Sequence, residues 1–79
     1  MNLSVKSAVP LAGYKLKVTF LNDEVKEFDV TPYLAKGIFK ELKNKDYFNQ
    51  VRVSFGAVEW PNQQDLSNDT LYLLGSSVE

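Results

Sequence analysis

The chain has 79 residues with no cysteine and no histidine, and its nine basic and ten acidic side chains give a formal net charge of −1. These counts exclude disulfides, thiolate nucleophiles and a Ser-His-Asp arrangement, and they leave zinc and iron without their usual ligands. The hydrophobic fraction of 44%, with 13% aromatic residues, is enough for the core of one small domain that spans residues 1–79.

The N-terminus shows no secretory signal, because it lacks an apolar segment before Pro10. No apolar run approaches the roughly 20 residues of a membrane-spanning helix. Together with the absence of cysteine, this pattern indicates a cytoplasmic protein without a membrane segment.

The first part of the chain has the pattern of three strands. Residues 3–9 form the first strand, which Pro10 ends before a turn at Ala12-Gly13. Alternation with polar residues gives the second strand one apolar face, made of Tyr14, Leu16, Val18 and Phe20. The third strand places Phe28 and Val30 inward.

The alternation of inward and outward residues sets the length of the loop between the second and third strands. A two-residue loop pairs Val18 with Glu27 and turns a carboxylate towards the core. A three-residue loop with a bulge instead brings Phe28 onto the face of Leu16 and sets Lys17 opposite Glu27 on the other face. Because a slip of one residue exchanges the two faces, the sequence predicts the three-residue loop.

Short helices follow. Thr31-Pro32 predicts a helix start, with a hydroxyl cap before a proline in the first turn, and Gly37 ends this helix. A second helical segment over residues 38–42 has one apolar face, made of Ile38, Phe39 and Leu42. Asp46 is predicted to cap one further turn.

Residues 52–55 and 57–60 predict a second hairpin. A type II′ loop at Gly56-Ala57 pairs Phe55 with Val58 and Val53 with Trp60 on the inward side. Pro61 then ends the strand, because proline cannot donate to a ladder.

A last helix follows the amide-rich loop after Pro61. Ser67 caps this helix, which carries Leu71, Leu73 and Leu74 and stops at Gly75, and residues 76–79 are predicted to be a frayed tail. The predicted fold class is therefore α+β, a small antiparallel sheet in the order β-β-β-α-β-β-α with short helices on one face.

Asp65 and Asp69, with Asn62 nearby, are the candidates for an acid pair or a hard-cation site. The other interpretation is turn and cap chemistry, which Asp and Asn favour, and the spacing does not match an EF-hand loop. We therefore predict no catalytic residue, no cofactor, no bound metal and no enzyme activity.

Lys36, Lys40 and Lys43 fall at i, i+4 and i+7, which makes one basic stripe if this segment is an α-helix. Such a stripe binds phosphate groups, nucleic acid or an acidic protein. The alternative is a solvated helix face, which Glu41 within the stripe and the near-neutral net charge favour.

Trp60 is the only tryptophan and has two interpretations. It is a core residue at the end of an inward-facing run, or it anchors an interface, since Trp and Tyr are enriched at binding hot spots. The second interpretation makes Trp60, Asn62, Asp65 and Tyr72 candidate interaction residues.

These patterns together resemble a bacterial family of small domains of unknown function, DUF2442. The resemblance covers nearly the whole chain and is most specific in the Trp60-Pro61-Asn62-x-x-Asp65-Leu66 loop and the closing Leu71-Tyr72 pair. Its other positions are Tyr14, Leu16, Val18, Phe20, Asp29, Gly37, Phe39, Leu42 and Phe48. Asp23 and Gln63 stand where the family has glycine in two of its loops.

The resemblance implies a compact α+β domain with no established activity. Its members occur alone, ahead of a helix-turn-helix domain, or beside another small protein in pairs that resemble toxin–antitoxin modules. We therefore expect a non-catalytic protein-interaction module, antitoxin-like, with a protein partner encoded nearby, and we leave a homodimer open. The alternatives are nucleic-acid or phosphate binding through Lys36, Lys40 and Lys43, and a carboxylate-dependent enzyme at Asp65 and Asp69.

Overall fold

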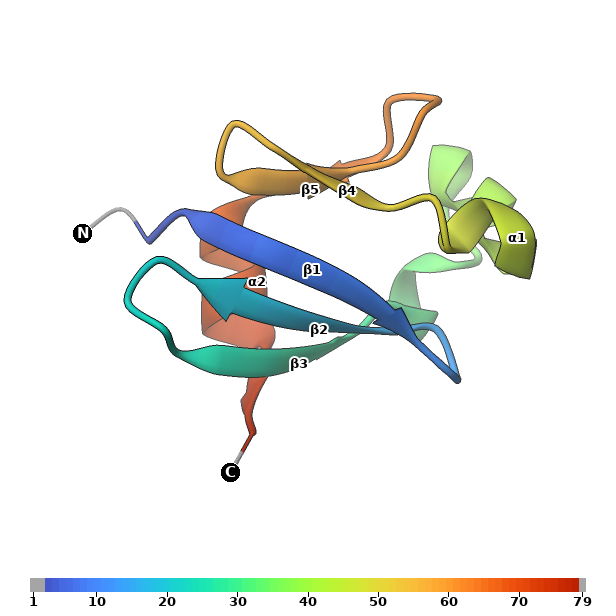
Figure 1. Cartoon of the computed structure of the whole chain (residues 1–79). Coiled ribbons are helices and arrows are strands. Elements are labelled where there is room, and N and C mark those ends of the chain that lie inside the picture. Colours follow the sequence, from blue (N-terminus) through green and yellow to red (C-terminus); the bar gives the residue numbers. More distant parts are fainter. Residues whose placement is uncertain (1–2, 79) are drawn as a thin grey trace.

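Two antiparallel sheets and several short helices build the domain, and a computed structural model describes residues 3–78 of it (Figure 1). The first sheet has the strand order β1 (Val5–Leu11), β2 (Lys15–Phe20), β3 (Val25–Asp29) and β7 (Ser76–Ser77). The second sheet has the order β4 (Arg52–Ser54), β5 (Ala57–Glu59) and β6 (Asp65–Leu66). The helices are η1 (Thr31–Tyr33), η2 (Gly37–Lys43), α1 (Lys45–Phe48) and α2 (Asn68–Leu74), of which η1 and η2 are 3-10 helices. The predicted fold class and element order are confirmed, and β6 and β7 are short strands that the prediction missed.

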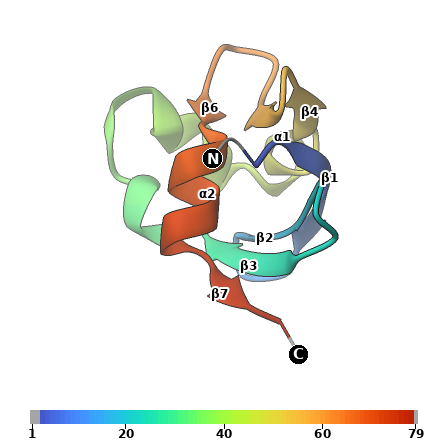
Figure 2. The same ribbon diagram turned by 90° about the vertical axis from the view of Figure 1, so that its left-hand side faces the viewer.

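Both sheets and three of the helices contribute to one core. Helix α2 packs against β3 and stands in front of the first sheet in Figure 2, whereas η2 and α1 lie near the end of that sheet where β1 turns into β2 (Figure 1). The largest fully buried apolar side chains are Trp60, Phe20, Phe28, Leu16, Leu42, Leu71, Val18, Val30 and Val58. No helix in the described part of the chain is long and apolar enough to cross a membrane.

The β2–β3 hairpin confirms the parity argument. Leu16 pairs with Phe28 and Lys17 with Glu27, and the Phe20 N–H donates to the Glu24 carbonyl at 2.9 Å. The loop is therefore residues 21–23, and Asp23 takes a left-handed φ of 68°.

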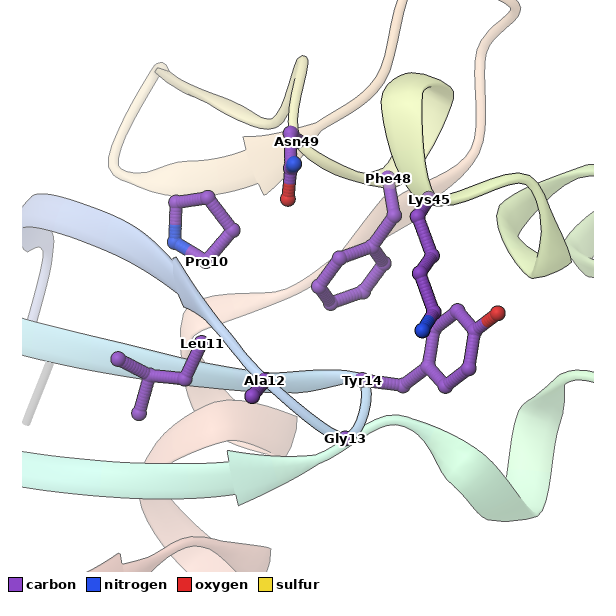
Figure 3. A pocket seen from close by; sticks show the side chains of 8 residues that line it. All are labelled: Pro10, Leu11, Ala12, Gly13, Tyr14, Lys45, Phe48 and Asn49. Carbon is purple, nitrogen blue, oxygen red and sulfur yellow. The ribbon is translucent and has the colours of Figure 1, made fainter.

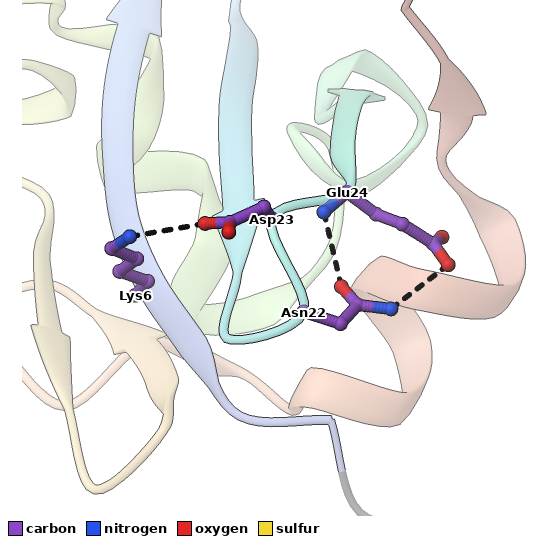
Figure 4. Close-up of polar contacts among 4 residues, drawn as sticks. All are labelled: Lys6, Asn22, Asp23 and Glu24. Atoms are coloured by element: carbon purple, nitrogen blue, oxygen red, sulfur yellow. Dashed lines mark hydrogen bonds and ion pairs between the residues drawn. The ribbon is translucent and has the colours of Figure 1, made fainter.

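Polar side chains hold this loop (Figure 4). The Asn22 Oδ1 accepts the Glu24 N–H at 3.0 Å, and the Asn22 amide donates to the Glu24 carboxylate at 2.8 Å. The Lys6 ammonium on β1 lies 3.1 Å from the Asp23 carboxylate, in an exposed ion pair.

Two predicted boundaries in this region were wrong. Pro10 lies inside β1, paired with Leu16, because β1 is the edge of its sheet and a missing N–H is tolerated there. Thr31 does not cap η1 with its side chain. Its hydroxyl donates to the Asp29 Oδ1 at 2.7 Å and its N–H donates to the same atom at 2.9 Å, and these bonds lower the pKa of Asp29.

The helical region differs from the prediction because η2 has three residues per turn. Gly37 begins η2 with a φ of 47° rather than ending the helix before it. Phe39 and Leu42 share one face and pack inward, whereas Ile38 lies a third of a turn away and is 60% exposed. The cap of α1 is Asn44, whose Oδ1 accepts the Tyr47 N–H, and Asp46 lies in the first turn instead.

The β4–β5 hairpin is shifted by two residues from the predicted register. Val53 pairs with Val58, and the loop is Phe55-Gly56, whose φ angles of 50° and 77° are typical of a type I′ turn. A shift of two residues keeps Val58 and Trp60 on the buried side. The predicted inward position of Phe55 is wrong, because this side chain leaves the sheet and is fully exposed at the hairpin tip.

The C-terminal helix begins and ends where the sequence predicts. The Ser67 Oγ accepts the Thr70 N–H at 3.2 Å, and α2 ends at Gly75. The predicted frayed tail is wrong for its described part, since residues 76–77 form β7 and the Val78 N–H donates to the Val25 carbonyl at 3.1 Å. Glu79 lies outside the described residues.

Candidate functional site

The loop after Trp60 has the same architecture as the loop between β2 and β3. Val58 pairs with Leu66, and the Trp60 N–H donates to the Gln64 carbonyl at 2.9 Å. This pairing leaves residues 61–63 as a three-residue loop, with Gln63 at a left-handed φ of 76°. Pro61 therefore stands at the start of a hairpin loop, and the chain returns beyond it as β6.

Trp60 is a core residue. Its side chain is fully buried, and the centre of its ring lies 5.8 Å from the centre of the Phe48 ring. Its indole N–H donates to the Phe48 carbonyl at 2.9 Å. A partner cannot reach this side chain in the folded protein, so the interpretation of Trp60 as an interface anchor is wrong.

Gln64 is the one buried polar residue that the described chain places in the core, and it is only 1% exposed. Its Oε1 accepts the Tyr47 hydroxyl at 2.6 Å, and its Nε2 donates to the Ile38 carbonyl at 2.8 Å and to the Glu41 carboxylate at 3.0 Å. These bonds satisfy the side-chain amide and fasten the loop to η2 and α1.

Asn62 completes this arrangement from the exposed side of the loop. Its N–H donates to the Tyr47 hydroxyl at 2.7 Å, and its Nδ2 lies 3.0 and 2.8 Å from the two oxygens of Glu41. We call Glu41, Tyr47, Asn62 and Gln64 the loop network. Since each of these contacts joins the loop to a neighbouring element, the loop network is structural, and Asn62 has a partner within the fold.

The loop network makes stability depend on the ionisation of Glu41. The hydrogen bonds from Asn62 and Gln64 hold the pKa of Glu41 below its ordinary value of 4.5. Because the pKa of Glu41 is lowered in the folded state, the ionised Glu41 stabilises the fold at pH values above its unfolded-state pKa. This stabilisation is lost as the pH falls through the folded-state pKa. We expect wild type to be more stable than Glu41→Gln at neutral pH and this difference to shrink in acid, as urea midpoints across the range will show. A difference that is constant with pH contradicts this linkage.

The left-handed residue of the same loop offers a stabilising substitution. Gln63→Gly is expected to raise the free energy of unfolding by about 1 kcal/mol, because a side chain at positive φ is strained where glycine is not. Asp23→Gly is the matched control at the equivalent position of the β2–β3 loop, and a smaller gain is expected there because Asp tolerates this conformation better. Urea unfolding of both variants tests the ranking, and equal or reversed gains contradict it.

The other predicted site residues are spread over the surface. Asp65 on β6 and Asp69 on α2 are exposed and line different surface pockets, so the structure does not bring this carboxylate pair into one pocket. The part of the chain described by the structure holds no group of three or more acidic side chains placed to bind a metal ion.

The lysines do not form the predicted α-helical stripe. Lys36 precedes η2 in an extended conformation, with its Nζ 5.7 Å from the centre of the Tyr33 ring. Lys40 and Lys43 are both on η2 and, three residues apart in a 3-10 helix, share one face. All three are exposed, and none forms an ion pair within residues 3–78.

A pocket of about 310 Å³ lies at the turn between β1 and β2 (Figure 3). Its walls include Gly13, Tyr14 and Phe48, with Lys45 and Asn49 at its side. Tyr14 has a left-handed φ of 60°, meets the Phe48 ring edge-on at 5.4 Å and donates its hydroxyl to the Lys43 carbonyl. These contacts explain the strained conformation of Tyr14, which fixes the turn against α1.

A second pocket, of about 420 Å³, lies beside α2 and is lined by Leu3, Asp69, Tyr72 and Leu73. We call it the α2 pocket. Tyr72 forms one wall and is held in place, because its ring packs edge-on against Phe20 at 5.2 Å and its hydroxyl donates to the Glu24 carboxylate at 3.1 Å. That hydrogen bond raises the pKa of Tyr72.

A family model described as "Protein of unknown function (DUF2442)" matches residues 5–75. The chain belongs to the DUF2442 family. The match begins in β1 and ends at the cap of α2, so this DUF2442 domain includes the whole loop network and both hairpins. Searches of curated proteins and of solved structures found no match.

Sequence reasoning about this DUF2442 domain missed the partners of Asn62. These partners, Tyr47 and Glu41, lie 15 and 21 residues before Asn62, and neither they nor Gln64 carry a recognisable motif. A signal for Gln64 was nevertheless available, because a three-residue loop after Trp60 places Gln64 opposite Trp60 and therefore on the buried side.

Proposed function

We propose that this DUF2442 domain is a non-catalytic protein-interaction module whose partner binds at α2. The observation that carries the proposal is the apolar outer side of that helix. Leu71 is buried in the core, whereas Leu73 and Leu74 are 76% and 66% exposed. Leu73 also lines the α2 pocket, so this exposed leucine borders a concave surface.

Burial of these side chains supplies the driving force for binding. Each leucine that a partner covers contributes about 1.5–3 kcal/mol, and an apolar groove beside a helix is a common form of protein recognition. Tyr72 adds an aromatic wall whose position is fixed before binding, which reduces the entropy lost in the complex.

The finer proposal concerns the partner. We propose a small protein encoded by the neighbouring gene, with this domain as the antitoxin-like member of the pair. In that arrangement the neighbour slows growth when it is expressed alone, and co-expression of this domain restores growth by covering the neighbour's active surface.

Co-expression with the neighbouring gene product, followed by size-exclusion chromatography with light scattering, tests the interaction. We expect one heteromeric complex, and we expect Leu73→Glu combined with Leu74→Glu to weaken it by about 100-fold or more. Ile38→Glu is the matched control, because Ile38 is comparably exposed but lies on η2. Separate elution of the two proteins, or an unchanged complex with the leucine variants, contradicts the proposal, and a dimer of this chain alone replaces it with self-association.

A second candidate is phosphate or nucleic-acid binding. The observation that favours it is a group of exposed lysines within ten residues, none in an ion pair among residues 3–78, which are Lys36, Lys40, Lys43 and Lys45. Such binding weakens steeply with salt, because it releases counterions. Titration with duplex DNA and with RNA at low salt tests this candidate, and the absence of binding by wild type, or an unchanged affinity in Lys40→Gln/Lys43→Gln, contradicts it.

A further inference from the structure

We propose that the tip of the β4–β5 hairpin is a second docking surface, which receives a basic segment of a partner protein. Phe55 anchors an apolar side chain of that segment, and Glu59 and Asp65 bind a lysine or arginine beside it. The inference rests on the proposed function because it assumes a protein partner, but it uses a surface other than α2.

Phe55 is a large aromatic side chain that the fold does not use. It is fully exposed and lies outside the hydrophobic core, in a turn position with a left-handed φ of 50°. Asn, Asp or Gly is favoured at this position of a type I′ turn, so phenylalanine is unfavourable there for its conformation as well as for its exposure. Binding to a partner accounts for both features.

The turn that carries Phe55 is held rigidly. The Gly56 carbonyl accepts the Val5 N–H at 2.8 Å, and a Cβ added at Gly56 would lie 2.7 Å from the Ser4 Oγ. The turn is therefore packed against the start of β1 and cannot collapse to cover the ring. An aromatic side chain presented on a fixed turn loses little entropy on binding, as is typical of an interface anchor.

Charge at the same place identifies the partner's chemistry. Phe55, Glu59 and Asp65 line one pocket of about 200 Å³, the tip pocket. Glu59 and Asp65 are direct cross-strand partners, an arrangement of like charges that destabilises a sheet. Arg52 lies 3.4 Å from Glu59, and Asp65 forms no ion pair within residues 3–78, so the tip pocket keeps one unpaired negative charge.

The size of the tip pocket favours a side chain over a small molecule. Small-molecule pockets hold about 300–1,000 Å³, and this pocket is smaller. An arginine fits its groups best, because a guanidinium binds carboxylates through two hydrogen bonds and also stacks on an aromatic face. A phosphate backbone or an anionic membrane is repelled by the same carboxylates.

Panning of a phage-displayed library of random peptides on the full chain tests this surface. We expect enrichment of lysine or arginine next to an apolar residue. Synthetic copies of the selected peptides are expected to bind at least about tenfold more weakly to Phe55→Ser and to Glu59→Gln/Asp65→Asn, and more weakly at high salt. The absence of enrichment, enrichment of acidic peptides, or equal affinity for Phe55→Ser overturns the proposal.

Three controls establish whether a loss of peptide binding arises at the tip pocket itself. Phe55→Asn creates the favoured Asn-Gly turn, so it is expected to raise the urea midpoint while losing the peptide, which separates lost binding from lost folding. The variant with both Leu73→Glu and Leu74→Glu is expected to lose the partner that binds at α2 and to keep its affinity for the selected peptides. Binding of wild type to vesicles of phosphatidylcholine and phosphatidylserine, lost in Phe55→Ser, assigns the anchor to a membrane and overturns the proposal.

Discussion

Replacement of Trp60 by alanine is expected to lower the free energy of unfolding by about 3–5 kcal/mol, the largest loss that we expect from any single substitution in this domain. Trp60 is fully buried, packs on Phe48 and donates its indole N–H to the Phe48 carbonyl. The substitution removes a large apolar surface and also the shorter of the two hydrogen bonds to that carbonyl, which keeps the Val51 N–H as a donor at 3.3 Å. Because a domain of this length has a total stability of about 4–12 kcal/mol, a large share of the variant molecules will be unfolded.

Urea unfolding followed by circular dichroism measures this effect, since the alanine variant lacks the fluorophore. Trp60→Phe is the graded control, because it keeps a ring in the core and loses only the indole hydrogen bond and part of the packing. Phe55→Ala is the control for an exposed aromatic residue, with little expected loss. A Trp60→Ala midpoint equal to that of wild type contradicts the assignment of Trp60 to the core.

Gln64→Leu is expected to lower the free energy of unfolding by about 2–3 kcal/mol, although leucine has a similar size and is more hydrophobic than glutamine. The reason is that Gln64 is buried and satisfies groups on three other residues, which are Tyr47, Ile38 and Glu41. Leucine fills the space but removes the acceptor of the Tyr47 hydroxyl and a donor to the Ile38 carbonyl, and the loss of partners by partly buried polar groups is costly.

Chemical denaturation with tryptophan fluorescence measures the Gln64 effect. Gln50→Leu is the matched control, since Gln50 is exposed and its side chain makes a long contact of 3.4 Å with the Asp46 carbonyl. A double-mutant cycle with Tyr47→Phe isolates the coupling between the two side chains. Gln64→Leu proteins as stable as wild type will show that the loop network does not contribute to stability.

The parity of apolar residues predicted the first hairpin because it excluded the two-residue loop, which turns Glu27 towards the core. Between β2 and β3, a three-residue loop keeps Phe28 inward and Glu27 outward, and the structure confirms it. Between β4 and β5 the same rule left two solutions, because a shift of two residues preserves the faces. The conformation of the turn decides between these two registers. There Phe55 takes a left-handed conformation that its residue type does not predict.

The candidate site was less predictable than the fold because its contacts are distant in sequence. The Trp-Pro-Asn loop was informative about family and core, but the partners of Asn62 and Gln64 lie on η2 and α1. The helical segment itself was misread as α-helical, which placed Ile38 inside and aligned the lysines in a stripe. Exposure of Phe55 and of the α2 leucines follows only from the three-dimensional arrangement.

The start of the described chain contacts α2, and the last strand pairs with β3, and these contacts have a consequence for how the protein folds. The Asn68 side chain donates to the Leu3 carbonyl across 65 residues, and β7 pairs with β3. Contacts this remote slow folding, because a long loop must close before they form. During synthesis the β1–β3 meander can form early, but its apolar face stays open until α2 and β7 have left the ribosome. The nascent chain is therefore most exposed to aggregation and proteolysis during that interval.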